Sequence, residues 1–122
     1  MNATIIHSSL IKYTPVSSAY GQIAGYSPNP VTVPRGSIVQ FVNDDNFVHT
    51  ATFVGTTSFP PGPLPLSSTS PSGSDLATPG WSSGDLQAGA FSQGFTASTS
   101  GTYYYGCYHH YGSPMRGVIV VQ

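Results

Sequence analysis

The chain has 122 residues, a length that suits one domain built around one hydrophobic core. Apolar residues make up 39% of the sequence, so the chain has enough apolar surface to fold and is not disordered. Charged residues make up only 6%, and this scarcity argues against nucleic-acid binding, which needs clustered Lys and Arg to neutralise phosphates.

Short β-rich stretches separated by Gly and Pro turns predict an all-β fold, and no stretch keeps the apolar period of a helix. Residues 37–43 show the alternation best, with Val39 and Phe41 on one face. In chain order, the predicted strands are residues 4–13, 30–34, 37–43, 48–54, 90–97, 102–108 and 117–121. They indicate an antiparallel Greek-key β-sandwich or barrel of about seven or eight strands.

The segment from residue 56 to residue 89 interrupts this spacing. It contains six prolines and many Ser and Gly residues, and it is long for a loop inside a compact domain. Apolar side chains within it, Trp81 above all, offer anchors against a core. We therefore expect residues 1–122 to form one domain, in which the 56–89 segment covers an edge or end of the sandwich and contains a short helical turn.

A cluster of potential metal ligands lies near the C-terminus. Cys107 is followed at C-x-x-H-x-x-x-x-M spacing by His110 and Met115, and His49 lies on a separate predicted strand. A thiolate, two imidazoles and a thioether are the ligand set of an electron-transfer copper site. Soft sulfur favours Cu(I), whereas imidazole binds either oxidation state, so we expect one copper ion that cycles between Cu(I) and Cu(II).

Other interpretations of these residues remain open. As the only cysteine, Cys107 cannot form an internal disulfide, and it is a buried apolar residue, a nucleophile or a ligand. A Cys–His nucleophile pair is disfavoured because no Asn or Asp lies at an obvious orienting position. His109 competes with His110 as the ligand, Met115 with a simple core residue, and His7 is expected at the surface.

The motif resembles that of the cupredoxin family, and its spacing is similar to plastocyanins and pseudoazurins. The resemblance also covers PVTVPRGSIVQFVNDD with the HTATF that follows, GTYYYGC before the cysteine and MRGVIVV after it. It extends over residues 30–54 and 90–122. It implies a blue copper protein that is not an enzyme and that transfers one electron at a time between partner proteins.

The resemblance also implies roles for residues around the ligands. Asn43 is expected to brace the region before His49. The Thr50 backbone N–H is expected to donate to the Cys107 sulfur, and the Thr50 side chain to tie the two ligand loops together. Tyr108 and His109 complete the set of residues expected around the ligands.

The sequence departs from plastocyanins at two positions. His109 stands where they usually have Pro before the second ligand His, so a second N–H group becomes available to the sulfur. Gly106 stands where many have a Tyr that serves as a remote entry point for electrons. A second docking site on that side is therefore not expected.

The resemblance implies that electrons pass through the exposed edge of His110. The surface around it is expected to include Tyr111, Gly112 and Pro114, together with Tyr108 and Phe47. We expect a monomer whose redox partners, an electron donor and an acceptor, dock at this apolar end with little dependence on salt. The alternatives are a periplasmic copper carrier or storage protein, a cupredoxin domain of a larger oxidase or reductase, and a β-sandwich adhesion module without metal.

The sequence also suggests a location. No stretch is long and apolar enough to span a membrane, and the first residues lack the basic and apolar regions of a signal peptide. These features fit a cytosolic protein, or one whose signal or anchor segment is missing from this sequence. The expected function favours the periplasm or another extracytoplasmic compartment. The scarcity of charge further suggests an acidic environment, where ion pairs are lost.

Overall fold

The computed structural model describes residues 3–122, which form ten strands and one short 3-10 helix. The strands are β1 (Ala3–Ser8), β2 (Val16–Ser18), β3 (Gly21–Ile23), β4 (Tyr26–Ser27), β5 (Val31–Val33), β6 (Ile38–Asn43), β7 (Thr52–Gly55), β8 (Phe95–Thr96), β9 (Gly101–Gly106) and β10 (Arg116–Val121). The 3-10 helix, η1, is Leu66–Thr69. The expected all-β class is confirmed.

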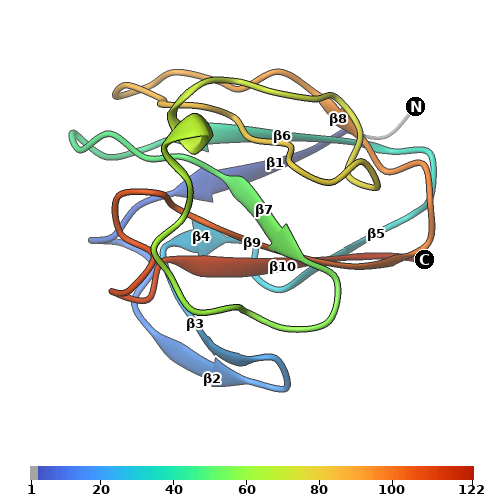
Figure 1. Cartoon of the computed structure of the whole chain (residues 1–122), viewed down its shortest axis with the longest axis horizontal. Helices are drawn as coiled ribbons and strands as arrows, with labels where there is room; N and C mark the ends of the chain where they lie inside the picture. The colour runs from blue at the N-terminus through green and yellow to red at the C-terminus, as the bar shows by residue number, and fades with distance from the viewer. Residues whose placement is uncertain (1–2) are drawn as a thin grey trace.

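Eight of these strands form two four-stranded sheets, one in the order β4-β1-β6-β8 and the other in the order β5-β10-β9-β7 (Figure 1). β2 and β3 form a separate hairpin. The sheets are mixed, because β1 pairs with β6 and β5 pairs with β10 in parallel, whereas we expected antiparallel pairing throughout. Parallel neighbours are connected through other parts of the chain, so local alternation does not predict them.

The core lies between the two sheets and is rich in aromatic side chains. β6 buries Val39 and Phe41 completely, as its alternation predicts. On the facing sheet, Tyr105 of β9 lies edge-on to Phe41 with ring centroids 5.3 Å apart. Tyr103, Tyr105 and Cys107 are all buried in this core. The prediction that these three side chains lie on one face of the strand is therefore confirmed.

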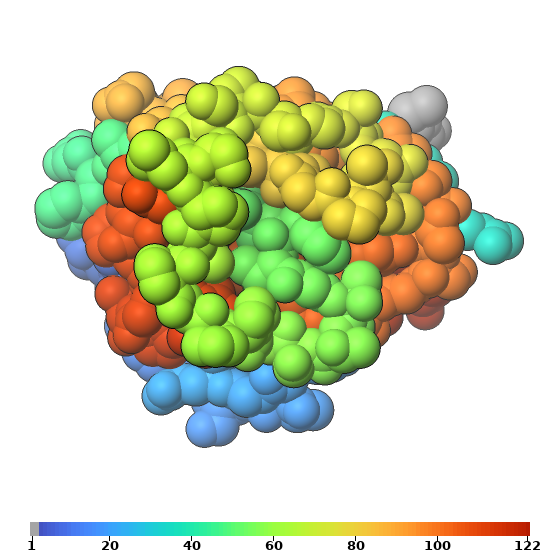
Figure 2. Space-filling model, viewed as in Figure 1, coloured from blue at the N-terminus to red at the C-terminus, as the bar shows by residue number. Residues whose placement is uncertain are grey.

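The 56–89 segment runs along the edge strand β7 and across the front of the molecule in Figure 2. Ser82 forms an isolated bridge with Thr52 of β7, and Leu86 forms one with His49. Trp81 is only 1% exposed, and its indole N–H donates to the Leu76 carbonyl. The expected helical turn and the Trp81 anchor are therefore both present.

Several strand boundaries differ from the prediction. The predicted strand at residues 48–54 begins only at Thr52, and the one at residues 90–97 is reduced to Phe95–Thr96. The three short strands β2, β3 and β4 were not predicted, because their Ser, Gly and Gln residues carry little β signal. Within residues 3–122, no helix is long and apolar enough to cross a membrane.

Candidate metal centre

Three loops meet at one end of the sandwich, on the left in Figure 1: the turn after β1, the β6–β7 loop and the 107–115 loop between β9 and β10. The β6–β7 loop carries His49, which is held by two backbone hydrogen bonds to Leu86. The 107–115 loop is folded on itself, because Cys107 N–H donates to Met115 O and Met115 N–H donates to His110 O. Residues far apart in the sequence are thereby brought together.

His49, Cys107 and His110 form a compact group of potential metal ligands. One donor atom from each residue lies within 4.8 Å of the other two. The Cys107 Sγ is 3.8 Å from Nδ1 of His49 and 3.6 Å from Nδ1 of His110. The two imidazole rings lie nearly edge to face, with centroids 5.1 Å apart. Three donors therefore surround one small volume.

These separations fit a single first-row metal ion. A nitrogen donor at about 2.0 Å and a sulfur donor at about 2.3 Å from the metal, about 120° apart in a trigonal plane, lie about 3.7 Å from each other. The two observed S–N distances are close to this value. Two imidazoles and a thiolate in a trigonal arrangement are the donor set that electron-transfer copper sites use.

Met115 completes the set of four. Its side chain is fully buried and belongs to the core cluster, and its backbone is hydrogen-bonded to both Cys107 and His110. Gly25 lies against it so closely that an added Cβ would be 3.3 Å from the thioether sulfur. Together with His49, Cys107 and His110, Met115 forms a potential copper site.

Burial controls the protonation of this site. Burial raises the pKa of the Cys107 thiol, although the backbone N–H groups of Thr50, His109 and His110 act in the opposite direction. Burial also lowers the pKa of His110, and the nearby His49 and His109 lower it further. A neutral imidazole keeps a lone pair free for a metal. The thiol, in contrast, would lose its proton when a metal binds to the sulfur.

Hydrogen bonds from Thr50, Tyr108 and Asn43 surround the potential ligands. Thr50 N–H donates to the Cys107 sulfur at 3.4 Å, and Tyr108 N–H donates to the Thr50 hydroxyl oxygen at 2.8 Å. The buried Asn43 donates to the carbonyls of Phe47 and Leu86, at 2.7 Å each. Both ligand loops are therefore held by side chains as well as by their own backbone.

The two other histidines near the site lie outside the donor group. The His109 side chain points away from it and lies 2.8 Å from Asp85 of the 56–89 segment. His110, and not His109, therefore belongs to the group of potential ligands. His7 lies on β1, partly exposed, 2.9 Å from Asp44. It is the edge histidine that the sequence indicates.

Asp45 is a buried neighbour of the site that the sequence reasoning missed. Its Oδ2 lies 2.7 Å from Nε2 of His49, and both side chains are almost fully buried. The expectation that no Asp or Asn orients a histidine was therefore wrong. The available signal was the four-residue spacing to His49, which a turn of the β6–β7 loop converts into contact.

Tyr111 also differs from expectation. We placed it on the surface around His110, but it is only 4% exposed. Its hydroxyl donates to the Pro60 carbonyl at 2.6 Å, and the Arg116 guanidinium stacks on its ring at 4.1 Å. Tyr111 thus joins the 107–115 loop to the 56–89 segment.

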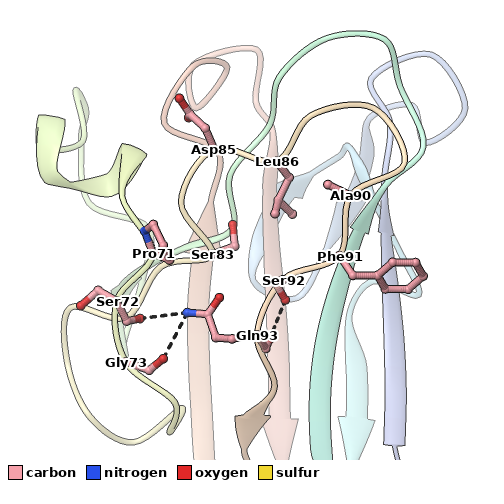
Figure 3. Close-up of a pocket in the computed structure, with 10 residues that line it drawn as sticks. All are labelled: Pro71, Ser72, Gly73, Ser83, Asp85, Leu86, Ala90, Phe91, Ser92 and Gln93. Atoms are coloured by element: carbon pink, nitrogen blue, oxygen red, sulfur yellow. Dashed lines mark hydrogen bonds between the residues drawn. The ribbon is translucent and has the colours of Figure 1, made fainter.

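A separate groove of about 540 Å³ lies between residues 71–73 and residues 83–93. Figure 3 shows its lining, with the Gln93 amide group donating to the carbonyls of Ser72 and Gly73. Asp85 is the only titratable side chain among the residues that line it. The groove therefore has no second set of metal ligands.

Comparisons with known proteins agree with this site. Residues 15–122 match the model of a family described as copper binding proteins of the plastocyanin/azurin family. No curated protein matches the sequence significantly.

Among solved structures, a reduced amicyanin variant is similar over 99% of this chain and 83% of its own, with a TM-score of 0.60 and 19% identity. A pseudoazurin from Sinorhizobium meliltoi is similar over 100% of this chain and 75% of its own, with a TM-score of 0.56 and 22% identity. At these identities the two structures support the fold alone.

Proposed function

This chain belongs to the plastocyanin/azurin family of copper-binding proteins, and from that premise we propose that it carries single electrons between redox partner proteins. The observation that carries the proposal is the group of two imidazoles and one thiol, two of them fully buried, whose donor atoms lie within 4.8 Å of one another. When bound, copper supplies the Cu(I)/Cu(II) couple.

In this proposal, His49, Cys107, His110 and Met115 hold the ion. Three of them belong to one short loop and the fourth to a neighbouring loop, and backbone hydrogen bonds restrain both loops. Side chains that are buried and restrained in this way change position little when the charge at the site changes. A small rearrangement lowers the barrier to electron transfer, which suits a carrier.

We assign supporting roles to four neighbouring residues. Asn43 keeps the β6–β7 loop in place by donating hydrogen bonds to the carbonyls of Phe47 and Leu86. Thr50 stabilises the thiolate with its backbone N–H and accepts from Tyr108 N–H with its hydroxyl, so it links the two ligand loops. His109 adds a further N–H near the sulfur and restrains the loop through Asp85.

Electrons are proposed to enter and leave at His110. Of the four ligand side chains, His110 is the only one that is not fully buried. Gly112 is exposed and Pro114 partly exposed beside it, and Phe47 of the neighbouring loop is 52% exposed. A small apolar rim favours brief docking, because small interfaces separate quickly. We further propose a monomer in an extracytoplasmic compartment.

The buried site argues against a nucleophilic enzyme. Cys107, His49 and Asp45 lie in the order of a catalytic triad, with 3.8 Å and 2.7 Å between successive groups. However, Cys107 and His49 are both 0% exposed, so no substrate reaches the sulfur. Burial also raises the pKa of the thiol, which is the opposite of what an activated nucleophile needs.

The test is the visible spectrum and voltammetry of the protein after addition of Cu(II). We expect an intense blue colour from thiolate-to-copper charge transfer, and a reversible one-electron wave. Cys107→Ser should abolish the colour, whereas the control His109→Ala should keep it. A colourless wild type, or a coloured Cys107→Ser variant, would contradict the copper site. A blue protein without a reversible wave would contradict electron transfer alone.

A further inference from the structure

Asp45 is held in one orientation by groups outside the candidate copper site. Ser9 Oγ lies 2.6 Å from its Oδ1, and Leu10 N–H donates to its Oδ2 at 2.7 Å. The Asp45 backbone N–H donates to the side chain of Asn43. The turn after β1 and the β6–β7 loop therefore position this carboxylate together, and its Oδ2 also faces Nε2 of His49.

Counting hydrogens determines the direction of these contacts. The Ser9 hydroxyl oxygen already accepts the N–H groups of Ile11 and Lys12, at 3.2 and 3.0 Å. Its single proton is therefore free to point at Asp45. Leu10 contributes an N–H, which can only donate. Each Asp45 oxygen thus accepts one hydrogen bond from a fixed donor, as a carboxylate does, and the remaining contact is completed by a proton on Nε2 of His49.

We propose that Asp45 is a positioning residue that holds His49 in its Nε2–H tautomer and thereby presents Nδ1 to copper. The proposal deepens the proposed function, because it assumes the copper site described above. In the neutral imidazole, a proton on Nε2 leaves the lone pair on Nδ1, the atom that faces the Cys107 sulfur at 3.8 Å. Without the carboxylate, nothing at Nε2 selects between the two nitrogens.

The same contact has an electrostatic consequence. A negative charge held one imidazole ring away from the metal position stabilises the more positive ion, Cu(II), more than Cu(I). Asp45 is 5% exposed, so water screens this charge only weakly. The carboxylate is therefore expected to keep the reduction potential lower than a neutral residue at this position would.

The neighbouring carboxylate offers a matched control. Asp44 follows Asn43 directly, but its side chain turns outward to His7 and Tyr13, at 2.9 and 3.2 Å. Asp44→Asn makes the same change in net charge as Asp45→Asn without removing a contact to His49. A difference between these two variants isolates the contact to His49 from a general effect of charge.

The first experiment needs no metal. Nitrogen NMR of the histidine-labelled, metal-free protein is expected to show His49 with its proton on Nε2. Asp45→Asn keeps an oxygen that can accept this proton, so the tautomer should persist. Asp45→Leu should give a mixture or the Nδ1–H form. A wild-type His49 protonated on Nδ1 would overturn the proposal, as would an unchanged tautomer in a folded Asp45→Leu variant.

The second experiment measures copper affinity and reduction potential. Loss of a side chain that orients a metal ligand weakens metal binding by about ten- to hundred-fold. We expect Asp45→Leu to lose at least that much affinity for Cu(II), with a smaller loss for Cu(I). Each tenfold difference between the two losses raises the potential by about 59 mV. Asp45→Asn should raise the potential less, and Asp44→Asn should leave it near the wild-type value.

The outcomes separate this inference from the proposed function. Equal shifts of the reduction potential in Asp44→Asn and Asp45→Asn would show that the effect comes from net charge alone. That result would overturn the assignment of Asp45 as a positioning residue. A wild-type protein that binds no copper would refute the proposed function, but the tautomer measurement would still stand. If Asp45→Leu does not fold, the wild-type tautomer and the Asp44→Asn and Asp45→Asn pair still decide the question.

Discussion

Replacing Thr50 by valine tests a buried chain of hydroxyl groups beside the candidate copper site. The chain runs from Tyr108 N–H to Thr50, then to Thr52 and Ser82, with separations of 2.8, 2.9 and 3.0 Å. Ser82 donates its only proton to the Ser68 carbonyl. Thr52 must therefore donate to Ser82, and Thr50 to Thr52, because each hydroxyl has one hydrogen. All the hydroxyl groups in this chain are buried.

The expected cost of Thr50→Val follows from the groups left without partners. Valine has nearly the same shape and keeps the backbone N–H that donates to the Cys107 sulfur. The partly buried Tyr108 N–H loses its acceptor, which costs about 1–3 kcal/mol. Thr52 loses the hydrogen bond that it accepts, at about 0.5–1.5 kcal/mol. We therefore expect the free energy of unfolding to fall by about 1.5–4.5 kcal/mol.

Denaturant unfolding of the metal-free protein measures this change, with the fluorescence of Trp81 as the signal, since it is the only tryptophan. Thr50→Ser is the control, because it keeps the hydroxyl and loses one methyl group, at about 0.8 kcal/mol. If valine cost no more than serine, the hydrogen-bonded chain would not stabilise the fold and the argument would be refuted.

Three further substitutions test contacts within the 107–115 loop and beside it. Gly106→Ala places a Cβ 2.5 Å from the Tyr111 ring, and unfolding experiments should show a loss of about 1–3 kcal/mol. Gly25→Ala places a Cβ 2.5 Å from Met115 Cγ at a φ of +84°, so the visible spectrum of the copper form should change through a displaced thioether. His109→Pro removes a backbone N–H that stabilises the thiolate, and voltammetry should give a lower potential, whereas His109→Ala should not. An unchanged stability, spectrum or potential, respectively, would contradict each of these expectations.

The sequence predicted the parts of the fold that depend on local alternation. The strands β6, β9 and β10 lie close to where the pattern of apolar residues indicated them. The parallel pairing of β1 with β6 was not predictable in this way, because it depends on how distant segments are connected. The hairpin of β2 and β3 was missed because polar residues in an exposed strand show no apolar period.

The candidate site also has a part that the local sequence predicts and a part that it does not. The ligand spacing in the 107–115 loop is a local property, and the group of donors that it predicted is present. The contact between Asp45 and His49 depends on the path of the β6–β7 loop. Hydrogen bonds of the Asn43 side chain and of the turn after β1 determine this path together. A spacing of four residues in a loop does not imply contact unless the loop closes on itself.

The glycine at position 106 has a structural explanation. The Tyr111 ring occupies the space beside the Gly106 Cα, where any side chain would collide with it. The ring is covered on its other side by Arg116, and its hydroxyl is bonded to Pro60. A tyrosine at position 106 is therefore incompatible with a buried Tyr111, and the 56–89 segment covers this side of the site. This arrangement supports the proposal that electrons are exchanged at the His110 end.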